Sequence, residues 1–197
     1  MGFVMETEAE KQARFAADCA RRVHEASLVW QRFAYERGLQ FGVDPASILP
    51  KLVGAREAVD VAIVALGSPR DGYRTRASAQ VVVPLEGRVR IAGPGGVDAL
   101  LGEIFPRKFF RERGAPELDG QLVVSSRPAE LARRIVDERA VATMARLAGQ
   151  RLDDFTYEGG AVAVVWAGVE QDVASLDSVL DLLVHVARLA QHSSAYR

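Results

Sequence analysis

The sequence predicts an α+β fold in which a mostly antiparallel sheet carries its helices on one face. Three observations predict it: amphipathic helical periodicity over residues 6–37, strict alternation of apolar and polar side chains over 73–83, and an apolar helical stripe over 173–190. Strand-like and helix-like segments do not alternate regularly, which argues against a parallel, doubly wound sheet. We therefore expect residues 1–197 to form a single α+β domain with a long N-terminal helix and a packed C-terminal helix.

The bulk composition is that of an ordinary globular protein. Of the 197 residues, 49% are hydrophobic and 26% are charged, and the formal net charge is -1. This balance gives no general attraction to nucleic acid or to a membrane surface, so we expect neither as a partner. The single cysteine, Cys19, rules out an internal disulfide and is compatible with a reducing compartment. No secretion signal or membrane span is predicted, and we expect a cytoplasmic protein.

The predicted N-terminal helix, within residues 1–38, has an apolar stripe with spacings of three and four. Phe15, Cys19 and Trp30 lie on this stripe, Phe33 broadens it, and Gly38 provides the C-terminal stop. A helix of this length can pack on its own sheet or on a second copy of itself. Phe15, Trp30 and Phe33 are therefore candidate residues of an interaction helix, and self-association through this helix or through a sheet edge is one expectation.

Residues 51–92 are predicted to form an antiparallel meander of strands. Alternation over residues 73–83 and 87–92 places one set of side chains toward the core and the other toward water. The outward set includes Arg74, Arg76, Arg88 and Arg90, which we expect to line the wet face of neighbouring strands. Such an arginine face is a candidate binding site for an anionic partner, and a solvated sheet face is the alternative.

Residues 120–194 are predicted to form a strand, a helix, a hairpin and a final helix. The helix is expected over 127–147, and Glu158-Gly159-Gly160 has the composition of a hairpin turn. The returning strand, 161–167, is apolar on both faces, which indicates a central position in the sheet.

A resemblance follows from the order of these patterned segments. The run WQRFAYERGLQF, then LVGAREAVDVAIVAL, YRTRASAQVVV and ELDGQLVVSSRPAELARRI, then a hairpin and a helix, resembles a diffuse set of uncharacterised bacterial proteins. The resemblance covers most of the chain and consists of patterned positions without a catalytic signature. It implies a fold pattern and no assigned activity.

No residue type in the sequence is spaced for a recognised reaction. His185 and His192 are seven apart on one helix, roughly 10 Å along its axis, which is too far for joint ligation of one metal ion. Ser125 and Ser126 precede a helix and are explained by capping, and Cys19 is explained as a small apolar residue. We therefore predict no catalytic residue, no metal and no cofactor.

Three function classes remain open from the sequence. The preferred hypothesis is a non-enzymatic interaction or assembly protein, because the first helix is long and no chemistry is visible. The second is a module that binds an anion or nucleic acid through the arginine face, although the balanced net charge weighs against nucleic acid. The third is a small-molecule enzyme whose site is assembled only in the folded chain.

Overall fold

The computed structural model describes residues 7–93, 103–104, 108–148 and 152–194. Its helices are α1 (Glu8–Arg37), α2 (Ala129–Ile135), α3 (Glu138–Ala148) and α4 (Val173–Ser194), with short 3-10 turns at Arg111–Arg113 and Pro116–Leu118. Its strands are β1 (Gln40–Val43), β2 (Pro50–Arg56), β3 (Val59–Ser68), β4 (Gly72–Gln80), β5 (Arg88–Ala92), β6 (Glu103–Ile104), β7 (Val123–Arg127), β8 (Leu152–Glu158) and β9 (Ala161–Ala167).

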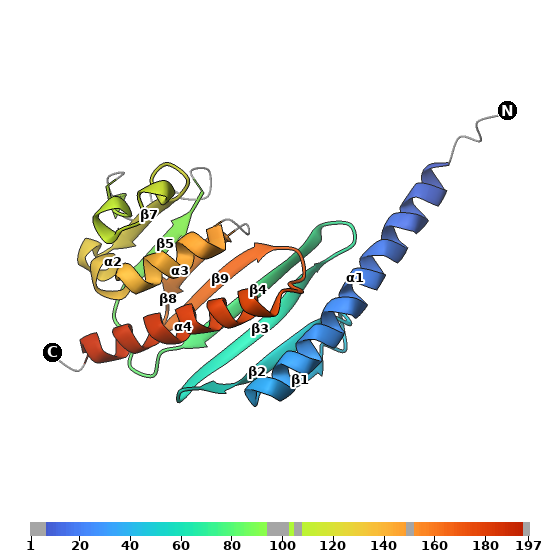
Figure 1. Cartoon of the computed structure of the whole chain (residues 1–197), viewed down its shortest axis with the longest axis horizontal. Coiled ribbons are helices and arrows are strands. Elements are labelled where there is room, and N and C mark those ends of the chain that lie inside the picture. The colour runs from blue at the N-terminus through green and yellow to red at the C-terminus, as the bar shows by residue number, and fades with distance from the viewer. Residues whose placement is uncertain (1–6, 94–102, 105–107, 149–151, 195–197) are drawn as a thin grey trace.

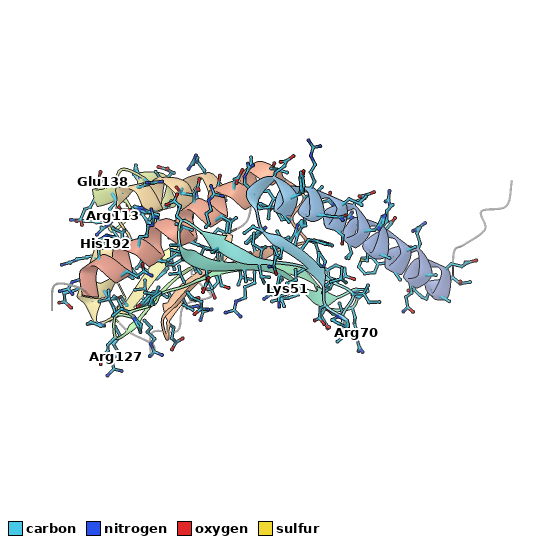
Figure 2. The ribbon with its side chains drawn as sticks, turned by 90° about the horizontal axis from the view of Figure 1, so that it is seen from below. Lys51, Arg70, Arg113, Arg127, Glu138 and His192 are labelled. Carbon is cyan, nitrogen blue, oxygen red and sulfur yellow. The ribbon has the colours of Figure 1, made fainter. Side chains whose placement is uncertain are left out.

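Within the described residues, these strands form one nine-stranded sheet in the order β1-β2-β3-β4-β9-β8-β5-β7-β6. Every neighbouring pair is antiparallel. Among the described residues, the helices lie on one face of this sheet and none lies on the other face (Figures 1 and 2). The predicted α+β architecture, with helices on one face of an antiparallel sheet, is confirmed.

The core lies between the sheet and its helices. Alternate strand residues point into it, so that Ile63, Ala77 and Val164 are completely buried under α4, while the intervening side chains face away from the helices. Strand β9 occupies the fifth place of nine in the described sheet, as its apolar character on both faces predicts.

The predicted 51–92 meander is only partly correct. Strands β2, β3 and β4 follow one another in the sheet, but β5 does not pair with β4. The hairpin β8–β9 lies between them, with β9 on β4 and β8 on β5. Alternation predicts which face of the sheet a side chain takes, but not which strand lies alongside. The predicted position of residues 87–92 next to β4 is therefore wrong.

The single helix predicted over 127–147 is two helices. Helix α2 ends at Ile135 and α3 begins at Glu138. Between them, the Asp137 carboxylate accepts a hydrogen bond from the Ala140 backbone N–H at 2.8 Å, which caps the start of α3. This cap allows the chain to turn while the apolar stripes of both helices remain on the core.

Two groups of contacts attach α1 to the rest of the molecule. The completely buried Trp30 donates its indole N–H to the Glu170 carbonyl oxygen at 2.7 Å. At the C-terminal end of α1, Arg37 pairs with Asp177 of α4, and Arg56 of β2 pairs with the same carboxylate at 3.1 Å and with Asp181 at 2.7 Å. The C-terminal half of α1 is therefore held on both the sheet and α4.

Candidate interaction surface

The N-terminal half of α1 extends beyond the sheet. Figure 1 shows the helix leaving the body of the molecule toward the N-terminus. From Glu8 to Arg22 its side chains are exposed except for half-buried Cys19, whereas the first completely buried side chain of α1 is Ala26. A helix of about 15 residues is only marginally stable alone in water. The capping box between Thr7 and Glu10 and the salt bridge between Lys11 and Glu8 support it locally.

Two grooves flank α1 in the region where the helix leaves the sheet. The first, which we call the loop groove, has a volume of about 540 Å³ and lies between α1 and the turns at 69–73 and 168–171. Its α1 side includes Phe15, Cys19, Arg22 and Glu25. The Gln171 side-chain amide donates a hydrogen bond to the Arg22 carbonyl oxygen at 3.2 Å, which links the 168–171 turn to α1.

The second groove, which we call the edge groove, has a volume of about 490 Å³ and lies between α1 and the outermost strand β1. Its lining is mainly apolar and consists of Ala20, Val23, His24, Ser27, Leu28 and Gln31 from α1 with Phe41, Val43, Ser47, Ile48, Leu49 and Tyr73. Three of these residues are large apolar side chains with high exposure, namely Leu28 (55%), Val43 (46%) and Ile48 (74%). Exposed apolar residues gathered on one edge are typical of a binding surface.

Tyr73 lines both grooves, beneath α1. Burial raises the pKa of its phenol, and the nearby Cys19 adds to the shift in the same direction. This shift favours the neutral phenol, so Tyr73 adds no charge to the lining of the two grooves.

The residues predicted for the interaction helix have different positions. Phe15 is 58% exposed on the projecting half of α1, at the loop groove. Trp30 and Phe33 are completely buried against the sheet, so they anchor α1 and are not accessible to a partner. The stripe is continuous, but the sheet covers only its C-terminal half.

The predicted arginine face is divided into two parts. Arg74 and Arg76 are exposed on β4, while Arg88 and Arg90 lie on β5, with β9 and β8 between them. At a spacing of about 4.8 Å between strands, this separates the two pairs by roughly 14 Å. Arg90 forms a bidentate pair with Asp154, at 3.0 and 2.9 Å. The prediction that these four arginines lie on neighbouring strands is wrong.

On β4, a smaller basic group remains on the face without helices. Arg76 lies opposite Val64 of β3, and Val64 in turn lies opposite Lys51 of β2. Lys51, Arg74 and Arg76 are all exposed, with apolar residues such as Val64 between them. Together they place three positive charges on this part of the sheet, although the net charge of the chain is close to zero.

Groups with possible chemistry elsewhere have structural roles. His185 contacts both oxygens of Asp137, at 2.9 and 2.8 Å, and so joins α4 to the start of α3. Ser126 accepts a hydrogen bond from the Ala132 N–H at 3.2 Å. The N-cap of α2 is Pro128, without a side-chain cap, so Ser125 and Ser126 do not occupy the predicted capping position. Among the residues described, no cluster of three or more His, Cys, Asp or Glu is arranged to hold a metal ion. The cavity between α3, α4 and the sheet has a volume of about 10 Å³, enough for about one water molecule.

Sequence patterns do not predict the edge groove. Its strand β1 has only four residues, and Leu28 is expected only to broaden the apolar surface of the first helix. The signal in the sequence is the pair of apolar residues Val43 and Ile48, which belong to no predicted helix or strand. No helix in the described part of the chain is long and apolar enough to cross a membrane.

Comparison with known proteins gives a fold relationship. No protein-family model and no curated protein match the chain. One solved structure that is similar is the mycobacterial trehalose monomycolate transport factor A, TtfA, with a TM-score of 0.59 and 16% sequence identity. The match covers 83% of this chain and 93% of that chain. At this level of identity, the two proteins share a fold.

Proposed function

We propose that this chain is a non-enzymatic interaction or assembly protein that binds a protein partner on the edge groove and the adjoining half of α1. The observation that supports this most directly is the concentration of exposed Leu28, Val43 and Ile48 around one groove at the end of the sheet. Burial of large apolar side chains is the main source of affinity in protein–protein contacts.

Two further observations support a docking role. The first is Ile48, a β-branched residue with a φ of 58°, in the left-handed region that favours glycine or asparagine. A strained backbone at an exposed isoleucine lowers the stability of the isolated chain. Contact of the Ile48 side chain with a partner would offset this cost and explain why isoleucine occupies the position. The second is the projecting half of α1, which has little packing of its own. The similar structure carries the name of a transport factor, and the proposal for this chain is of the same general kind.

The proposal is tested by site-specific photo-crosslinking of the full chain in cells of the organism that encodes it. A photoreactive amino acid at Leu28 is expected to give protein adducts. The same amino acid at Val82 serves as the matched control, because Val82 is also apolar and exposed but lies just after β4, at the opposite end of that strand from Tyr73. Absence of adducts at Leu28, or equal adducts at both positions, would refute a docking role for the edge groove.

A second candidate function is supported by the basic group on the open sheet face. Lys51, Arg74 and Arg76 are exposed on this face, with the uncharged Val64 between Lys51 and Arg76. They would bind a polyanion through charge, so the affinity should fall steeply with salt. Replacing Arg74 and Arg76 by Ser should abolish binding of a short polyphosphate at low ionic strength. Binding that survives this double substitution would count against the candidate.

A further inference from the structure

We propose that a second copy of this chain occupies the β1 edge, with the two β1 strands paired antiparallel around Gly42 to join the sheets. This inference rests on the proposed function and names one partner for the same surface. Three features of the edge support it: the absence of charge, proline and bulge in β1, the direction of its outward backbone groups, and the register that follows from that direction.

The edge strand is short but lacks the other devices that block a sheet edge. Natural edge strands are kept unpaired by short length, charged side chains, prolines or bulges. Strand β1, Gln40–Val43, has the sequence QFGV, without a charge or a proline, and pairs with β2 along its whole length without a register shift. In the described part of the sheet it has no neighbour on its other side.

The pairing with β2 determines which backbone groups face outward. Asp44 donates its N–H to the Leu49 carbonyl at 3.0 Å, and the next pair along the ladder is Val43 with Pro50, which has no N–H. Hydrogen-bonded and non-hydrogen-bonded pairs alternate in an antiparallel ladder. The backbone N–H and C=O groups of Phe41 and Val43 therefore point away from β2, toward the free edge.

Only one two-fold register uses both outward residues. Centred on Phe41, the pairing would place Val43 opposite Leu39 of the second copy, but the Leu39 N–H is already bonded to the Ala34 carbonyl at 2.9 Å. Centred on Val43, it would place Phe41 opposite Pro45, which has no N–H. Centred on Gly42, it pairs Phe41 with Val43 of the second copy and satisfies both residues in each chain.

The side chains on this edge agree with the backbone register. Phe41 and Val43 lie on the helix side of the sheet, in the edge groove, together with Leu28 and Ile48. A strand added to β1 would cover this lining and remove apolar surface from water in both copies. Position 42 faces the opposite side of the sheet, and a Cβ atom added there would meet no atom within 4 Å in the same chain. Because glycine has no side chain, the two chains can approach closely at the two-fold axis through Gly42.

The register is tested by disulfide trapping in the full chain with Cys19→Ser, which removes the single native cysteine. In a non-hydrogen-bonded pair the two Cα atoms at position 42 would be about 4.5 Å apart, within the range of a disulfide. Gly42→Cys should therefore form a covalent dimer under mild oxidation. The matched control is Gln40→Cys, on the same face of β1, for which the two copies would be roughly 14 Å apart. Equal trapping at both positions, or none at Gly42→Cys, would overturn the register.

Sedimentation equilibrium gives a test that does not depend on a new cysteine. Val43→Lys places a charge on the edge and should weaken dimerisation at least tenfold, while Val82→Lys should leave it unchanged. Ile48→Asn should also weaken the dimer, yet raise the melting temperature of the monomer by relieving the backbone. A monomeric wild type at high concentration would end the dimer proposal. If heterologous adducts still formed at Leu28, the proposed function would stand without it.

Discussion

Replacing Trp30 tests whether α1 is anchored as the structure shows. The indole is completely buried, and its N–H donates to the Glu170 carbonyl oxygen. Burial of about 200 Å² of aromatic side chain at ~25 cal/mol/Å² corresponds to about 5 kcal/mol. Since alanine keeps one methyl group and the site partly relaxes, Trp30→Ala should lower the free energy of unfolding by about 4 kcal/mol.

Trp30→Phe separates packing from the hydrogen bond. Most of the ring remains, but the Glu170 carbonyl loses its donor, so we expect a loss of about 2 kcal/mol. Tyr35→Ala is the matched control, because Tyr35 lies on the same helix and is 90% exposed; its effect should stay below about 0.5 kcal/mol. Urea unfolding followed by far-UV circular dichroism measures all three. Losses below about 1 kcal/mol for Trp30→Ala would show that α1 is not packed on the sheet through this residue.

Two further predictions concern stability. The side-chain hydrogen bond from Arg37 is the main reason that the pKa of Asp177 lies below its ordinary value, so this carboxylate stabilises the fold above about pH 4, and the contribution is lost as pH falls through the lowered pKa. Asp177→Asn should therefore cost about 1–2 kcal/mol at neutral pH and progressively less in acid, as measured by urea titrations across pH; a pH-independent loss would contradict the ion pair. Gly87 has a φ of 121°, and an added Cβ would collide with the Arg127 carbonyl oxygen. Gly87→Ala should cost about 3 kcal/mol or more, while Gly42→Ala, at an open site, should cost under 1 kcal/mol in the same thermal-unfolding assay; similar losses would refute the steric argument.

Much of the architecture could be predicted from local pattern. Alternation identified which side chains of β4 and β5 face the core, and the glycines at 159–160, with φ of 58° and 79°, form the expected hairpin turn. Strand order could not be predicted in the same way, because β5 has the same alternation whether it pairs with β4 or with β8. The sequence pattern does not predict the break between α2 and α3 at Asp137, because the apolar stripe continues through it.

The interaction surface, too, could be predicted only in part from local sequence pattern. Periodicity identified Phe15, Trp30 and Phe33 as one stripe, but the place where the sheet stops beneath α1 depends on tertiary packing. The edge groove depends on β1, a strand too short to recognise by pattern, and on the position of Ile48 beside Leu28. Its residues come from α1, β1, the following turn and β4, and their proximity depends on the tertiary fold.

The insertion of β8–β9 between β4 and β5 has a consequence for folding during synthesis. Strands β1–β4 and strands β5–β7 emerge from the ribosome first, and neither group can reach the other in the sheet without the late hairpin. The edge of β5 has no partner in the sheet until β8 (Leu152–Glu158) is made, and the edge of β4 has none until β9 (Ala161–Ala167) is made. Two open edges on one nascent chain favour mispairing. The β8–β9 hairpin, which turns at Gly159-Gly160, is therefore the element whose arrival completes the centre of the sheet.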